Sequence, residues 1–199
     1  MYTNKTISAY ITNLGRYTEG ELVGKWVNFP TTENEMQEVL REIGIDGIQY
    51  EEIFITDYES DIDGLCDGLG EYENLSTLNY LAAKVQDADC STEELEAVLA
   101  YGEYTGSAAE IISLLDQLDC FVLYEGIDND YALGEYLVSE TGLLPEDDFL
   151  SRYFDYEAYG RDVQMEEGGM YSAHGYIALI DIPIIDPLAE IPEEYRLRY

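Results

Sequence analysis

The chain has 199 residues, and its 43 Asp and Glu against 9 Lys and Arg give a formal net charge of −34. Such a field repels nucleic acids, acidic substrates and anionic membranes, and it attracts cations and proteins whose natural ligand is a polyanion. Hydrophobic residues make up 46% and aromatic residues 13%, so the sequence predicts a folded body with an acidic surface and not a disordered acidic tail.

Composition and local motifs set further limits. The N-terminal MYTNKTISAY lacks a basic region followed by an apolar one, so no signal peptide is expected. No apolar run approaches the roughly 18 residues of a membrane span. The three cysteines, Cys66, Cys90 and Cys120, have neither zinc-site spacing nor an obvious disulfide framework. A location in the reducing cytoplasm is therefore expected.

Residues 1–60 predict an α+β domain. β-branched and aromatic residues predict strands at Thr6–Leu14, Lys25–Phe29 and Ile48–Thr56. Thr32 and Glu35 have the spacing of a capping box at the start of a helix over Glu33–Ile43.

Residues 61–119 predict a helical, strongly acidic domain. Helices are expected at Leu75–Val85, Thr92–Tyr101 and Ala108–Leu118. Ser91 with Glu94, and Ser107 with Glu110, have capping-box spacing at the second and third of these helices.

Residues 120–182 return to an α+β pattern. Cys120–Tyr124 and Tyr176–Ile182 are expected to be strands, Asn129–Glu140 a helix ending near Gly142, and Pro145–Gln164 partly helical. Residues 183–199 contain three prolines and little periodicity, and they are expected to be an appendage of unknown role. The predicted fold class is thus α+β, an elongated chain of small domains: α+β, helical, then α+β.

The middle of the chain supplies candidates for a partner-binding surface. In the helix Thr92–Tyr101 the apolar residues fall on one side, while Asp89, Glu93, Glu96 and Glu103 fall on the other. An i to i+4 step rises about 6 Å, and two nucleotide steps along one DNA strand rise about 6.8 Å. Carboxylates on such a helix can approximate the phosphate interval, although an ordinary solvated face is the simpler interpretation. The candidates are Asp87, Asp89, Glu93, Glu94, Glu96, Glu103, Glu110, Asp116, Asp119, Glu125, Asp128, Asp130 and Glu135.

Catalytic and metal sites are weakly indicated. Glu59, Asp61, Asp63 and Gly64 imitate an EF-hand loop, but its twelfth position is Gly70 and not the required Glu. The single histidine, His174, is more typical of a surface or packing residue than of a catalytic base. No catalytic residue, metal site or cofactor is predicted, and nucleic acid is not expected as a ligand.

Three motifs occur in order over about residues 7–180. Leu14–Pro30, LGRYTEGELVGKWVNFP, resembles the N-terminal signature of the ArdA antirestriction proteins. Ile53–Glu59, IFITDYE, resembles the strand end that follows it, and Tyr153–Val163, YFDYEAYGRDV, resembles a C-terminal motif of the family. The chain departs from the family at Gly160, where Ala is usual, at Val163, and in its extension beyond about Asp181.

The resemblance implies an elongated, three-domain antirestriction protein of conjugative plasmids and transposons. Such a protein imitates bent B-form DNA and occupies the DNA-binding groove of type I restriction–modification enzymes in the bacterial host cytoplasm, so that incoming mobile DNA escapes cleavage. It also implies a homodimer joined through the C-terminal domain, where the candidates are Tyr153, Phe154, Asp155, Tyr156, Glu157, Tyr159, Arg161 and Asp162. An acidic cation-binding or chaperone-like protein, and a carboxylate-based hydrolase, remain as alternatives.

Overall fold

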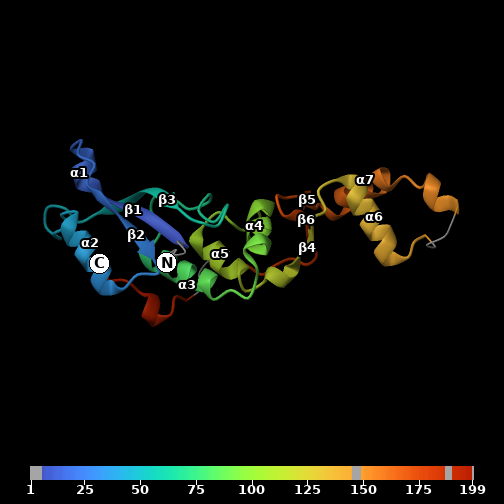
Figure 1. Ribbon diagram of the computed structural model, residues 1–199. Coiled ribbons are helices and arrows are strands. Elements are labelled where there is room, and N and C mark those ends of the chain that lie inside the picture. The colour runs from blue at the N-terminus through green and yellow to red at the C-terminus, as the bar shows by residue number, and fades with distance from the viewer. Residues whose placement is uncertain (1–5, 145–148, 187–189, 199) are drawn as a thin grey trace, which may run out of the picture. The chain divides into compact units, whose positions relative to one another are not determined.

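The computed structural model describes residues 6–144, 149–186 and 190–198 (Figure 1). The chain forms two compact units. Unit 1 comprises Met1–Asp89, Glu103–Gln117 and Ile184–Tyr199, and unit 2 comprises Cys90–Gly102 and Leu118–Pro183. Each unit contains a three-stranded antiparallel sheet with helices, which confirms the mixed α+β class. The division into domains at residues 1–60, 61–119 and 120–182 stays a prediction.

The sheet of unit 1 has the order β2-β1-β3, formed by β1 (Ile7–Asn13), β2 (Gly24–Phe29) and β3 (Ile53–Glu59). Alternation along β1 directs Ile7, Ala9 and Ile11 to one face, where all three are completely buried. Tyr10 pairs with Trp26 across the other face. One side of this sheet is therefore core, and the other carries aromatic side chains.

The α-helices in the described part of unit 1 are α1 (Leu14–Thr18), α2 (Glu33–Glu42), α3 (Leu75–Gln86) and α5 (Ala108–Leu114). The predicted capping box of α2 is confirmed, since Thr32 and Glu35 each accept a backbone hydrogen bond from the other. At α5 the capping box is only half formed. The Ser107 hydroxyl accepts from the Glu110 N–H, but the Glu110 carboxylate accepts from the Gly106 N–H at 2.9 Å. The helix also ends at Leu114, four residues before the predicted end.

The predicted strand over residues 48–56 was wrong in its first half, because β3 begins only at Ile53. The Asp46 carboxylate accepts hydrogen bonds from the backbone N–H groups of Ile48, Gln49 and Tyr50, at 2.9, 2.8 and 3.0 Å. These donors, that of Tyr50 most strongly, lower the pKa of Asp46. An aspartate that accepts hydrogen bonds from the N–H groups that follow it holds the chain in a turn, so the strand cannot begin at these residues.

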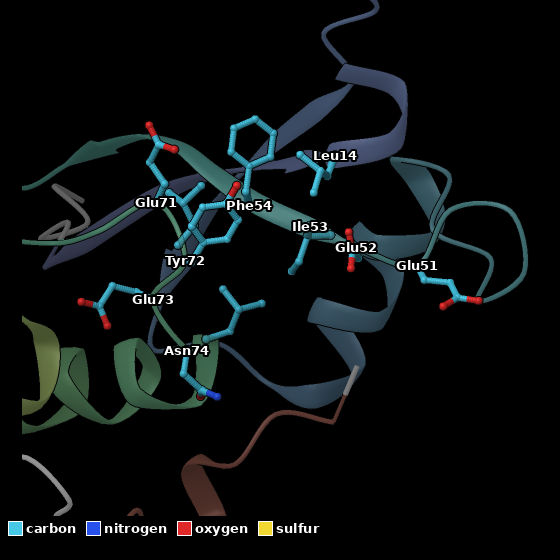
Figure 2. Close-up of a pocket in the computed structure, with 11 residues that line it drawn as sticks. Leu14, Glu51, Glu52, Ile53, Phe54, Glu71, Tyr72, Glu73 and Asn74 are labelled. Atoms are coloured by element: carbon cyan, nitrogen blue, oxygen red, sulfur yellow. The ribbon is translucent and has the colours of Figure 1, made fainter. Parts of the chain in front are cut away.

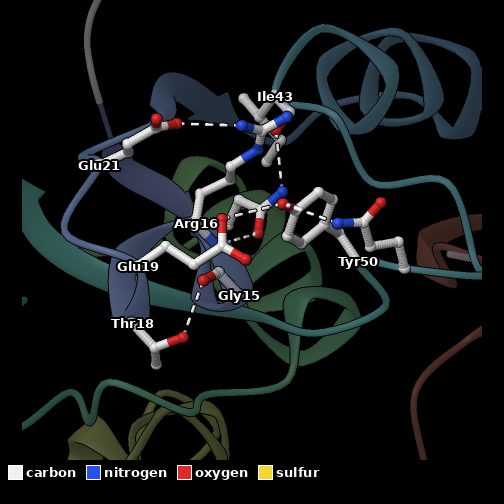
Figure 3. Close-up of polar contacts among 9 residues, drawn as sticks. Gly15, Arg16, Thr18, Glu19, Glu21, Ile43 and Tyr50 are labelled. Atoms are coloured by element: carbon white, nitrogen blue, oxygen red, sulfur yellow. Dashed lines mark hydrogen bonds and ion pairs between the residues drawn. The ribbon is translucent and has the colours of Figure 1, made fainter.

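Side-chain contacts then fix Tyr50 against α1 (Figure 3). The Tyr50 hydroxyl donates to Glu19 at 2.9 Å, and the Arg16 guanidinium lies 4.7 Å from the ring centroid. Arg16 also pairs with Glu21 at 3.0 Å. A Cβ at Gly15 would lie 2.5 Å from the Tyr50 ring, so glycine is required for this close approach.

Unit 2 is built on the sheet β4-β6-β5, formed by β4 (Phe121–Glu125), β5 (Met170–Tyr171) and β6 (Gly175–Leu179). Its helices are α4 (Thr92–Tyr101), α6 (Asp130–Thr141) and α7 (Tyr156–Glu167). α4 has the predicted bounds, and α6 ends as expected at Gly142, which has a left-handed φ of 62°. Short 3-10 helices occupy Leu118–Cys120, Phe149–Tyr153 and, in unit 1, Glu193–Tyr195. Pro145 to Asp148, within the segment predicted to be partly helical, lie outside the described residues.

The C-terminal segment is part of unit 1 and not an appendage. Leu197 is buried, and its backbone N–H donates to the Ser76 hydroxyl of α3 at 2.9 Å. Asn79, one turn further along α3, donates to the Tyr195 carbonyl at 3.1 Å. The sequence predicted an appendage because this segment has little periodicity. Burial of Leu197 and hydrogen bonding of the backbone nevertheless stabilise its packing on α3. No helix in the described part of the chain is long and apolar enough to span a membrane.

Candidate partner-binding surface

The acidic residues lie at the surface of both units. Across residues 6–144, 149–186 and 190–198, no Asp or Glu is buried, and most are exposed. This follows from the cost of transferring a carboxylate from water to an apolar interior, which is several kcal/mol without a partner.

The thirteen candidate carboxylates divide between the units, with five in unit 1 and eight in unit 2. Nine are exposed: Asp87, Asp89, Glu93, Glu103, Asp116, Asp119, Glu125, Asp128 and Glu135. Four are half-buried: Glu94, Glu96, Glu110 and Asp130. They lie on α3 to α6, their connections and the end of β4, so the structure does not gather them into one pocket.

Glu96 was expected on the solvent-facing side of its helix, and this expectation was wrong. Its Oε2 atom lies 2.6 Å from His174 Nε2, and the Glu96 side chain is only 14% exposed. Glu96 comes from α4, while His174 comes from the β5–β6 turn, so 78 positions of sequence separate the partners. Periodicity along one helix cannot reveal a contact that another element makes.

Two further candidates have structural contacts of their own. Asp130 accepts from the Tyr171 hydroxyl at 2.8 Å, and burial followed by this hydrogen bond raises the pKa of Tyr171. Asp116 pairs with Lys84, whose ammonium also donates to the Ile112 carbonyl at 2.8 Å. These contacts, like those of Glu96 and Glu110, engage carboxylates that the sequence offered for a partner.

The C-terminal motif divides into packed and exposed residues. Asp155 caps the start of α7 by accepting from the Ala158 N–H at 3.0 Å. Phe154, Tyr156 and Tyr159 are half-buried, and the Phe154 ring makes edge contacts with the other two at 5.1 and 5.7 Å. By contrast, Tyr153 is 73% exposed. The remaining motif residues, all exposed, are Glu157, Arg161 and Asp162.

Two glycines explain how α6 and α7 can cross so closely. A Cβ added at Gly160 would lie 1.9 Å from the Asp130 carbonyl oxygen, and one added at Gly134 would lie 1.9 Å from that of Tyr156. Because the obstructing atoms are backbone, neither helix has room for a larger residue without moving. Gly160 and Gly134 therefore face one another's helix backbone at this crossing, and each lies where a side chain would collide.

A cavity in unit 1 was not predicted from the sequence. It has a volume of about 560 Å³ and lies between the start of β3 and the segment before α3 (Figure 2). Leu14, Ile53 and Phe54 contribute apolar surface. The acidic lining residues are Glu51, Glu52, Glu71 and Glu73. The IFITDYE motif indicated a strand here, but pairing of the two segments, with Ile55 N–H donating to the Glu71 carbonyl at 2.8 Å, depends on tertiary structure.

Two observations bear on the EF-hand-like loop and on the cysteines. Over the residues that the structure describes, no three or more His, Cys, Asp or Glu side chains form a group that could hold a metal ion. The loop with Glu59, Asp61 and Asp63 lies within these described residues. Burial, followed by the charge of Asp67, raises the pKa of the Cys66 thiol to about 11, so this thiol is protonated and weakly nucleophilic at neutral pH.

Comparison with known proteins identifies the chain's relatives. The family model described as antirestriction protein (ArdA) matches residues 9–178, a range that contains all three recognised motifs. A search of curated proteins gave no match. Since the family model covers well over half of the 199 residues, the chain belongs to the ArdA family of antirestriction proteins.

Proposed function

We propose that this chain blocks the DNA-binding groove of type I restriction–modification enzymes by presenting carboxylates where DNA presents phosphates. The observation that carries this proposal is the exposure of acidic side chains over both folded units of an ArdA family member with net charge −34. At the charge density of duplex DNA, 34 charges correspond to roughly 58 Å of helix axis. The action is binding and not catalysis, and its place is the cytoplasm of a bacterium that receives mobile DNA.

The exposed carboxylates are the best candidates for phosphate mimicry. Asp89, Glu93 and Asp119 are exposed, so each can approach a lysine or arginine of the enzyme. Glu96 and Asp130 are different, because His174 and Tyr171 engage them. We therefore expect the candidates with internal partners to contribute least to binding.

A competition assay tests this proposal. A type I methyltransferase core bound to a labelled duplex is titrated with the protein at about 50 and 200 mM salt. Displacement at stoichiometric protein, weakening as salt rises, is expected because ion pairs between carboxylates and basic groups replace those to phosphate. If several type I enzymes keep their DNA at excess protein, the proposal is refuted.

Charge-matched variants show whether position matters. The test variant neutralises four candidates: Asp89→Asn, Glu93→Gln, Asp119→Asn and Glu125→Gln. The control removes the same charge outside the candidate set: Glu33→Gln, Glu38→Gln, Glu51→Gln and Glu52→Gln. At about 0.2–1 kcal/mol per exposed pair, four losses amount to about 1–4 kcal/mol, or roughly five- to several-hundred-fold in affinity. If both variants weaken binding to the enzyme equally, then binding depends on net charge and not on phosphate mimicry by residues 87–135.

We also propose that the functional form is a homodimer joined through the C-terminal motif. Tyr153 is 73% exposed and Phe149 is 65% exposed, and their rings lie 5.0 Å apart. Such adjoining apolar rings are typical of interaction surfaces. Tyr156 is a poorer candidate for the dimer contact, because it already packs against Tyr131 at 5.7 Å. Arg152 and Arg161 can offset part of the repulsion between two acidic chains.

Light scattering at about 0.15 M salt, where the Debye length is near 8 Å, tests the dimer. The wild type is expected to be dimeric at micromolar concentration, and Tyr153→Asp is expected to be monomeric. Tyr17→Asp, at a 50% exposed tyrosine of unit 1, is the control and should stay dimeric. A monomeric wild type refutes the dimer, and a dimeric Tyr153→Asp moves the interface elsewhere.

A further inference from the structure

The second face of the unit 1 sheet carries a row of aromatic side chains. The Tyr10 and Trp26 rings meet edge to face at 5.4 Å, and Tyr17 meets Phe54 in the same way at 5.0 Å. Together with Leu22 they line a cavity of about 500 Å³, which we call the aromatic groove. The opposite face of the sheet is core, so this groove is additional to the packing that the fold needs.

The groove leaves apolar surface in contact with solvent. Leu22 is 65% exposed, Tyr17 50% and Trp26 38%. For Trp26 the cause is strand alternation, because the side chains of its two neighbours in β2 point to the other face of the sheet, where Val27 is buried. Single exposed apolar residues are common, but several that line one concavity are typical of an interaction site.

Charge at the groove selects the kind of partner. Its lining includes the carboxylates of Asp57 and Glu71, and its described lining residues include no basic side chain. The nearby bases are engaged: Arg16 pairs with Glu21 and lies over a tyrosine ring, and Lys25 pairs with Glu42. Glu71 also borders the neighbouring cavity, and Figure 2 shows it beside Phe54 and Tyr72. Aromatic faces with adjacent carboxylates attract a cation that can also stack.

We propose that the aromatic groove binds an arginine and the adjoining apolar side chain of a protein partner. A guanidinium is planar and weakly hydrated, so it stacks on aromatic rings better than an ammonium does and pairs bidentately with a carboxylate. Some proteins stack nucleic-acid bases on aromatic side chains, but the net charge of −34 disfavours a nucleic acid as the ligand of this groove. The proposal stands independently of the antirestriction function, because it rests only on the groove's own residues.

The chain contains a natural reporter for this binding, since Trp26 is its only tryptophan. The probes are two capped peptides of equal charge, GRLGRLGRLG and its lysine counterpart GKLGKLGKLG, titrated into the full-length protein at about 0.15 M salt. We expect a saturable change of Trp26 fluorescence with the arginine peptide, and an affinity about two- to fivefold higher than for the lysine peptide. Equal affinities would mean distributed charge attraction and overturn the proposal.

Matched variants locate the contact. The groove variant combines Leu22→Ala with Glu71→Gln. The control variant combines Leu143→Ala with Glu38→Gln, so it loses the same apolar side chain and the same charge at exposed positions outside the groove. All four positions are exposed, so both double variants are expected to keep the wild-type circular dichroism. The groove variant should bind the arginine peptide at least about threefold more weakly, and the control should bind it as the wild type does. Equal weakening of both variants, or a similar Trp26 response to a single-stranded oligonucleotide, overturns the proposal.

Discussion

Replacement of Gly160 by alanine tests the closest helix contact in unit 2. The added Cβ would lie 1.9 Å from the Asp130 carbonyl oxygen, while ordinary contacts lie near 3.5 Å. The helices α6 and α7 would therefore have to separate by roughly 1.5 Å. Overpacking of this kind costs about 1–3 kcal/mol, and more where backbone obstructs. Because backbone obstructs here, the upper part of this range applies, about 2–3 kcal/mol. Alanine returns about 1 kcal/mol through helix propensity, so we expect a net loss of about 1–2 kcal/mol.

Thermal unfolding followed by near-UV circular dichroism measures the effect, because 19 tyrosines supply the signal. For a unit of this size, the loss corresponds to a decrease of about 4–16 °C in Tm. Ser139→Ala, at an exposed position of α6, is the control and should unfold at or slightly above the wild-type temperature. A Gly160→Ala variant at least as stable as the wild type would refute the reasoning, because the crossing would then have room for a methyl group.

Leu197→Ala should destabilise unit 1 by about 2–4 kcal/mol in urea unfolding, because it empties a buried position; an unchanged midpoint would mean that the C-terminal segment does not pack there. Stability should fall as pH rises above about 10, because burial most strongly raises the folded-state pKa of Tyr171 and Tyr176, while unfolded tyrosines ionise near 10; an unfolding midpoint that is constant up to pH 11.5 would contradict this. His174→Ala should lower the free energy of unfolding by about 1 kcal/mol, because the contact with Glu96 is lost. At a saturating concentration, this variant should still inhibit restriction. A folded His174→Ala without inhibition would point instead to a discrete site at this residue.

Local chemistry made several elements predictable from sequence. The Thr32–Glu35 capping box fixes the start of α2, and Gly142 ends α6, because these hydrogen bonds and dihedral angles involve residues within a few positions of one another. The predicted strand at residues 48–52 failed for a local reason as well, since Asp46 forms a turn that the β-favouring residues after it concealed. Turn chemistry thus outweighed strand propensity.

The sequence by itself determined the net charge, because net charge depends on composition alone, and the expectation of a partner that binds polyanions rests on that charge. Only the tertiary structure decided which carboxylates remain available, as Glu96 illustrates: its partner His174 lies 78 positions away. The same holds for Gly160 and for the buried Leu197, whose neighbours come from other segments. Long-range contacts are set by the packing of whole faces, which no periodicity within a single element records.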